Sequence, residues 1–276
     1  MSVLRRFLST PEGIAGAVIL LVLALTAVLA PALFPRDPLA IAGTPLLPPF
    51  QDWSLPLGTD RLGRDVLAGV VHGARTSLAV ALAAAAMSIV VGAVVGTAAG
   101  FSGGIVDEVL MRIADAFQTV PGFLLALAFV STIGVSTPVI VLAIALGAWA
   151  DPARLTRAQV LVIREADYVA SARVIGMHPA EMAFREILPN ALMPVLVLSA
   201  TIVAGAILTE AALSFLGLGN PNLATWGSMI AEGRSVLRSA SYLSIIPGSA
   251  LAVTVLGVHL FSEGLGKALG SHAVRV

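Results

Sequence analysis

Residues 76–106 read TSLAVALAAAAMSIVVGAVVGTAAGFSGGIV, a run of 31 residues without a charged side chain. About 20 apolar residues in a helix cross the hydrocarbon core of a bilayer, so this run is long enough to span a membrane. Gly92, Gly96 and Gly100 recur at every fourth position, and small residues at that spacing let a second helix approach closely. The run therefore predicts a membrane-spanning helix that packs against a neighbour through its glycines, with a wide cavity beside the helix as the alternative reason for these small residues.

The composition of the whole chain agrees with a membrane protein. Of 276 residues, 58% are hydrophobic and 12% are charged, whereas about 25% of residues are charged in ordinary soluble domains. This balance excludes a soluble cytosolic enzyme and a disordered chain. The net charge is zero, with 16 basic and 16 acidic residues, which argues against a nucleic-acid partner.

Two absences limit the chemistry further. The chain has no cysteine, which excludes disulfides, cysteine-ligated metal sites and thiol catalysis. Its single lysine, Lys267, precedes Ala268, whereas a phosphate-binding P-loop needs Lys followed by Ser or Thr. Any ATP that this protein uses must therefore be bound by a partner.

Five uncharged runs are long enough to be spans, at residues 13–35, 76–106, 116–150, 187–209 and 239–262. The third has 35 residues with breakers at 134–138, so we expect two helices joined by a tight turn. The prediction is thus an all-α polytopic protein with six transmembrane helices. Residues 211–231 are also uncharged but rich in glycine, asparagine and proline, and we expect a loop packed on protein at the membrane surface.

Six spans place both termini on one side, predicted to be the cytoplasm of a multi-pass plasma or inner membrane protein. Ten basic residues then fall inside and six outside, the sign that the positive-inside rule requires. The first run is longer than the core of a typical signal peptide, so we expect an uncleaved helix rather than a signal peptide. Residues 36–74 would be extracytoplasmic, and residues 151–186 would form a charged cytoplasmic segment.

Within that segment, residues 167–184 read DYVASARVIGMHPAEMAF. The first part suits a short helix that Gly176 would end in the left-handed conformation. Pro179 would open a second helix, with Glu181 favourable near its N-terminus. The interpretation is a docking element for a cytoplasmic motor, and the alternative is a solvated loop that only joins two spans.

The spacing in this segment resembles the permease motif of bacterial ABC importers. That motif reads Glu-Ala-Ala, three residues, Gly, then ten residues before Ile-x-Pro. Here the glycine is Gly176, and Ile187-Leu188-Pro189 stands at the same spacing. The triplet is Ala170-Ser171-Ala172, so the acid of the motif is absent from this chain.

Three further stretches resemble the C-type permeases of dipeptide and oligopeptide importers. They are LGTDRLGRDVLAGVVHGARTSL at 57–78, AGFSGGIVDEVLMRIADAFQTVP at 99–121 and TEAALSFLGLGNPNLATWGSMIAEG at 209–233. The resemblance extends from residue 57 to about residue 269, with the motifs in the same order along the chain.

The resemblance implies a type I importer permease, a non-catalytic subunit that moves di- or oligopeptides inward by alternating access. Its implied partners are a second unlike permease subunit, two ATP-binding subunits, an extracytoplasmic substrate-binding protein and membrane lipid. ATP and Mg would be bound by the partners, and this chain would hold no cofactor and no metal. Nickel chelates, glutathione and opine-like solutes are alternative cargoes, and an ATP-independent secondary carrier is a more distant alternative.

The resemblance also assigns regions and residues. Residues 1–74 would be an N-terminal helix with an extracytoplasmic segment, residues 75–269 the permease domain with a coupling-helix insert at about 165–186, and residues 270–276 a cytoplasmic tail. The residues expected to contact an ATPase are Ala170, Ala172, Arg173, Gly176, Met177, His178, Glu181 and Pro189.

Two further charged groups lie next to or inside the spans. Glu108 and Arg112 are four apart and Arg112 and Asp115 three apart, so we expect pairing on one helix face, either at a gate or in a neutralised cluster at a helix entry. Glu210 lies in the fifth span, where an acid is costly and often functional. It would either face the translocation path or lie solvated at the interface.

Overall fold

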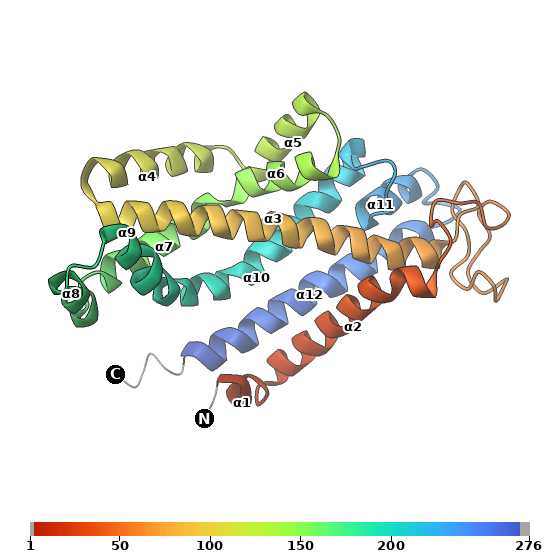
Figure 1. Ribbon diagram of the computed structural model, residues 1–276. Helices are drawn as coiled ribbons and strands as arrows, with labels where there is room; N and C mark the ends of the chain where they lie inside the picture. The colour runs from red at the N-terminus through yellow and green to blue at the C-terminus, as the bar shows by residue number, and fades with distance from the viewer. Residues whose placement is uncertain (1–2, 271–276) are drawn as a thin grey trace.

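The computed structural model describes residues 3–270, almost all of them in helices or in the loops that join them (Figure 1). Residues 271–276 of the expected tail lie outside the described residues. The elements are α1 Val3–Phe7, α2 Pro11–Leu33, α3 Val66–Ser102, α4 Gly104–Thr119, α5 Gly122–Ile133, α6 Thr137–Ala148, α7 Ala150–Ile163, α8 Asp167–Val174, α9 Pro179–Glu181, η1 Met182–Ile187, α10 Leu188–Leu213, η2 Ser214–Leu218, α11 Trp226–Arg234 and α12 Tyr242–Gly270.

The bundle has up to six membrane-spanning units in the described chain. Four helical stretches are long and apolar enough alone: α2, α3, the continuous run Pro179–Leu218 and α12. The pair α4 and α5 bends by 84°, the pair α6 and α7 bends by 46°, and each pair passes the same test as one broken span. The predicted six spans are confirmed when each pair is counted as one, and the chain is a multi-pass membrane protein.

The bent pairs correct the predicted boundaries of the middle spans. The turn at 134–138 is present between α5 and α6, but each of these helices has only 12 residues. Twelve residues cover about 18 Å, too little for a bilayer core. When each bent pair is counted as one span, α4 and α7 complete these spans, and residues 107–115 and 151–163, expected to lie outside the membrane, then belong to the spans.

The glycines of the opening run do pack against another helix, as predicted. A Cβ on Gly96 would lie 2.2 Å from the carbonyl oxygen of Ala153, and one on Gly92 would lie 2.7 Å from Pro152. Any larger side chain on this face of α3 would therefore push α7 away. Close helix packing, rather than a wide cavity, explains why small residues recur on this face of α3.

The N-terminal helix packs along the last helix of the chain. A Cβ on Gly16 would lie 2.3 Å from the backbone nitrogen of Phe261, so α2 and α12 are almost in backbone contact. At the chain ends, Lys267 Nζ donates to Glu12 Oε1 at 2.7 Å. Large apolar side chains such as Val28, 75% exposed, remain on the outer face of α2. Such a surface suits lipid and would be unfavourable in water.

Residues 34–65, between α2 and α3, form an ordered cap on one end of the bundle. Tyr242 Oη donates to the carbonyl oxygens of Leu47 at 3.0 Å and Thr59 at 2.8 Å, which fastens the cap to the start of α12. Residues 66–74, expected in this segment, are instead the first two turns of α3, with Asp65 as the N-cap.

The glycine-rich stretch at 211–231 is partly helical, which corrects the predicted loop. The α10 helix runs to Leu213 and continues as the π-helical turn η2, where Gly217 has φ +84°. A second helix, α11, starts at Trp226 under a capping box between Thr225 and Ser228. Figure 1 shows α11 at the same end of the bundle as the ordered cap, and α8 and α9 at the opposite end with the described chain ends.

Candidate functional site

The α8 segment ends at Gly176 in a complete Schellman motif. Gly176 has φ +80°, its N–H donates to the Arg173 carbonyl, and the Met177 N–H donates to the Ala172 carbonyl, both at 3.1 Å. These are the two bonds that satisfy the last carbonyls of a helix. The prediction that Gly176 stops this helix in the left-handed conformation is confirmed.

One face of α8 holds it on the bundle. Val169 and Ala172 are buried in a cluster with Met182, Ile187 and Ala191. Figure 1 shows α8 projecting from the end of the bundle beside α9. This packing fixes the position of a helix that is only eight residues long and too short to be stable alone.

A chain of hydrogen bonds also connects α8 to the start of α10. Asn190 Nδ2 donates to Tyr168 Oη at 3.2 Å, and Tyr168 Oη donates to the Glu186 carbonyl at 3.3 Å. Tyr168 lies on α8 and Asn190 in the first turn of α10. These side chains, which the sequence pattern did not single out, connect α8 to the start of α10.

The opposite face of α8 and the turn after it are exposed. Val174 is 87% exposed and Ile175 is 78% exposed. These two adjacent apolar side chains are available for contact with another protein. They were not among the residues predicted for ATPase contact.

The predicted contact residues divide into two groups. The exposed residues are Ala170, Arg173, Gly176 and His178 at α8 and its turn, and Pro189 at the start of α10. Met177 and Glu181 are half-buried, and Ala172 is buried. Pro179 does open a helix, but α9 has only three residues and continues through η1 into α10 without a break. The second helix of the insert is thus the first part of the next span.

Charged residues at the α4–α7 boundary pair between helices rather than within α4. Arg157 donates from Nε to Asp107 Oδ1 at 2.5 Å and from Nη2 to Asp107 Oδ2 at 2.6 Å. Arg154 pairs with Asp115. Within the described chain, Arg112 forms no ion pair with Glu108 or Asp115, so the expected partners were wrong although the cluster is neutralised.

Glu210 occupies neither of the two positions considered from the sequence. Its side chain is 1% exposed, so it is neither solvated nor on a path. Its carboxylate accepts hydrogen bonds from Ser77 of α3 at 3.0 Å and from Ser214 of η2 at 2.7 Å. Ser77 Oγ also lies 3.4 Å from the Trp226 backbone N–H of α11. Glu210 thus joins three helices below the cap.

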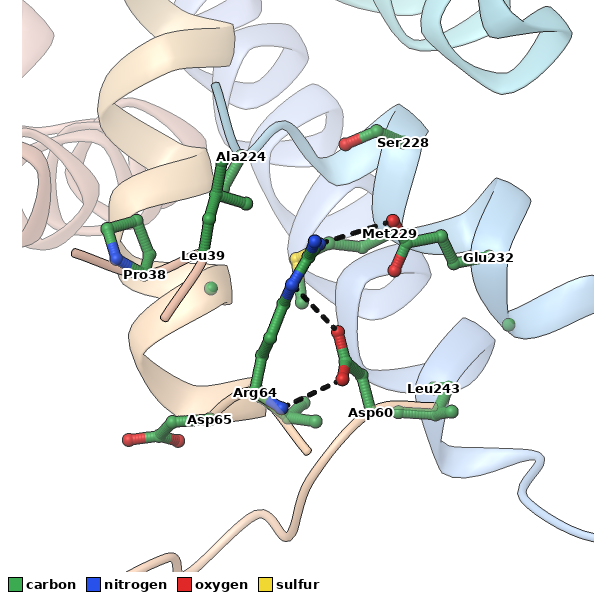
Figure 2. A pocket seen from close by; sticks show the side chains of 13 residues that line it. Pro38, Leu39, Asp60, Arg64, Asp65, Ala224, Ser228, Met229, Glu232 and Leu243 are labelled. Carbon is green, nitrogen blue, oxygen red and sulfur yellow. Dashed lines mark hydrogen bonds and ion pairs between the residues drawn. The ribbon is translucent and has the colours of Figure 1, made fainter. Parts of the chain in front are cut away.

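A small pocket opens between the cap, α3 and α11 (Figure 2). Arg64 lies 3.9 Å from Asp60 and 3.6 Å from Glu232 of α11. Burial, together with the negative charge of Asp60, raises the pKa of Glu232, while Arg64 and Arg61 oppose the shift. The pocket therefore lies where charged residues of the cap meet Glu232 of α11.

Comparison with known proteins agrees with this geometry. Residues 88–272 match the family described as binding-protein-dependent transport system inner membrane component. A probable peptide ABC transporter permease protein of Sinorhizobium fredii is 42% identical over 92% of this chain and 87% of its own length. The oligopeptide transport system permease protein of Bacillus subtilis is 34% identical over 96% of this chain and 87% of its own.

A third relative carries a different cargo name. The glutathione transport system permease protein of Pectobacterium atrosepticum is 35% identical over 96% of this chain and 88% of its own length. Each of the three alignments covers more than nine-tenths of the chain. This chain belongs to the family of binding-protein-dependent transport system inner membrane components, the permease subunits of ABC transporters.

Proposed function

We propose that this chain is the C-type permease subunit of an ATP-driven importer of di- and oligopeptides. The observation that carries the proposal is the α8 turn, a rigidly capped segment with two bare apolar side chains at the end of the bundle. The names of the two peptide-transport relatives support the peptide cargo. Glutathione is the second candidate, supported by the name of the third relative.

In the proposed complex, other subunits bind ATP and capture the cargo. A second unlike permease completes the membrane unit, two ATPases bind ATP and Mg below it, and a substrate-binding protein docks outside. The chain itself is non-catalytic. The α8 end of the bundle faces the cytoplasm together with both termini, and the cap at residues 34–65 faces outward, in the plasma or inner membrane.

The coupling would run from α8 into the spans. When the ATPases close on ATP, they move α8, and Tyr168 and the buried Val169 pass that motion to α10. The bent pairs and α10 then move against the rest of the bundle. A packed helix that transmits such a shift is a known way to alternate access.

The test is purification of the tagged chain from its native membrane in mild detergent, with mass spectrometry of the proteins that remain bound. We expect a second permease, the ATPases and a binding protein whose retained small molecules identify the cargo. A cysteine at Val174 should then cross-link to an ATPase, whereas one at Trp53, in the cap, should not. Recovery without any ATPase after cross-linking would reject the proposal.

A further inference from the structure

A cavity of about 210 Å³ lies between the broken spans and α10. Its lining includes Gly122 and Gly147, where α5 and α6 are almost in backbone contact, since a Cβ on Gly122 would lie 2.8 Å from the Gly147 carbonyl oxygen. Gly205 of α10 lines it as well, and a Cβ there would have no neighbour within 4 Å. Both helix breaks, α4 to α5 and α6 to α7, adjoin this cavity.

One acid, Asp151, lines the cavity at a depth where acids are rare. It lies fourteen residues after the start of α6 at Thr137, which is about 20 Å of helix and close to the middle of the broken span. Its side chain is exposed rather than buried in the bundle. A carboxylate at that depth does not face lipid, because the cost would be several kcal/mol; it faces water or a partner protein.

Neighbouring polar groups also indicate that Asp151 faces water or a partner protein. Asp115 and Arg154, 41% and 51% exposed, lie beside Asp151 on the surface that α4 and α7 share. Gln118 of α4 and Thr201 of α10 are exposed beside the cavity. Broken helices with polar groups near the middle of the bilayer are where membrane transporters bind their substrates.

Unlike Asp107 and Asp115, Asp151 forms no ion pair with any residue that the structure describes. Asp107 is neutralised by Arg157 and Asp115 by Arg154. Asp151 accepts one hydrogen bond, from Gln118 Nε2 at 2.5 Å, and no cation of the described residues lies within 4 Å of it. The cavity therefore carries one uncompensated negative charge.

We infer that this cavity is a cargo subsite in which Asp151 holds the protonated amino group of a peptide in transit, with Gln118 orienting the carboxylate. The inference rests on the proposed function and adds to it a residue and a chemical class. An amino group is the cation that every free peptide carries, and an unpaired carboxylate attracts it electrostatically.

The first test needs no cargo and uses the lack of cysteine in the chain. In the purified importer, Thr201→Cys places a single thiol in this chain beside Asp151. We expect it to react about tenfold faster with a trimethylammonium methanethiosulfonate than with the sulfonate analogue, because the carboxylate attracts the cation. Asp151→Asn should abolish this preference. Glu108→Gln, which removes an exposed acid on the outer face of α4, should leave it unchanged.

The second test measures uptake of free di- and tripeptides, tri-alanine among them, by the importer in proteoliposomes. Asp151→Asn should reduce uptake at least fivefold, Asp151→Glu should restore part of it, and Glu108→Gln should stay within twofold of the wild type. An unreactive thiol at 201, equal rates with both reagents, or normal uptake by Asp151→Asn would overturn the subsite. Failure of the wild type to take up any peptide would instead reject the peptide function, while the thiol rates still report on the cavity.

Discussion

Ser77 of α3 and Glu210 of α10 are 133 residues apart in the chain, yet the Ser77 hydroxyl donates to the Glu210 carboxylate at 3.0 Å in the interior of the bundle. Ser214 donates to the other oxygen of the same carboxylate. A buried acid with hydroxyl donors on two elements fixes the relative position of the helices that carry them. Glu210 therefore holds these helices together at the cap end of the bundle.

Replacement of Glu210 should separate hydrogen bonding from charge. Glu210→Ala leaves the buried hydroxyls of Ser77 and Ser214 without an acceptor and opens a cavity, so we expect a loss of about 2–4 kcal/mol of stability. Glu210→Gln keeps an acceptor and the volume, so its loss should be about 1 kcal/mol. Thermal unfolding of the purified complex in detergent measures both. Equal losses would show that charge, rather than hydrogen bonding, is what matters at this position.

Substitutions of Gly176 test the proposed coupling role of the turn after α8. Its φ of +80° costs a β-branched residue about 1–2 kcal/mol, although a Cβ would meet no neighbour within 4 Å. Gly176→Val should assemble with its partners but show reduced uptake per ATP hydrolysed, whereas Gly176→Asn should be close to the wild type, because asparagine tolerates this conformation. Co-purification reports assembly, and uptake with ATP hydrolysis in proteoliposomes reports coupling. Full uptake by the valine variant would remove the proposed role of the turn.

The Asp107–Arg157 pair joins the two broken spans and is suited to a double-mutant cycle. Two parallel hydrogen bonds connect the side chains, so the coupling energy should be about 1–2 kcal/mol after allowance for the partial exposure of Arg157. Asp107→Asn and Arg157→Gln should each lower the unfolding temperature. The double variant should lose less than the sum of both, and strict additivity would show that the pair contributes nothing to stability.

Glu232 should make stability depend on pH. Its pKa in the folded chain is raised, first by burial and then by Asp60. A raised pKa means that the folded state binds the proton more tightly, so this stabilisation is present below the ordinary pKa of 4.5 and is lost as the pH rises through the folded pKa. Glu232→Gln resembles the protonated form, so its unfolding temperature should exceed that of the wild type by more at pH 7.5 than at pH 4. Glu165→Gln at the opposite end, 74% exposed, is the control and should show no such difference.

Single cysteines test the proposed orientation. Ser54 lies in the cap and His178 follows the α8 turn, and both are exposed. In intact cells, Ser54→Cys should react with a membrane-impermeant thiol reagent and His178→Cys should react only after lysis. The reverse pattern would invert the orientation and contradict import as the direction of transport.

The sequence by itself determined the class of the protein and the local elements. The uncharged runs require helices that satisfy their own backbone in lipid, and the spacing of Gly92, Gly96 and Gly100 requires a close helix neighbour. The left-handed turn at Gly176 followed from local chemistry as well. Such features depend on a few adjacent residues, so no knowledge of distant partners was needed.

Only the tertiary structure decided which residues meet. Arg157 was available to Asp107 rather than to a helical neighbour, and Glu210 became buried, because α3, α7 and α10 bring distant residues to the same depth. The boundaries of the middle spans were also wrong, since charged residues that look like a loop in the sequence can continue a helix when each pairs with a residue of another helix. Asp151 stands out for the same reason: that no described cation pairs with it becomes visible only when every helix around it is in place.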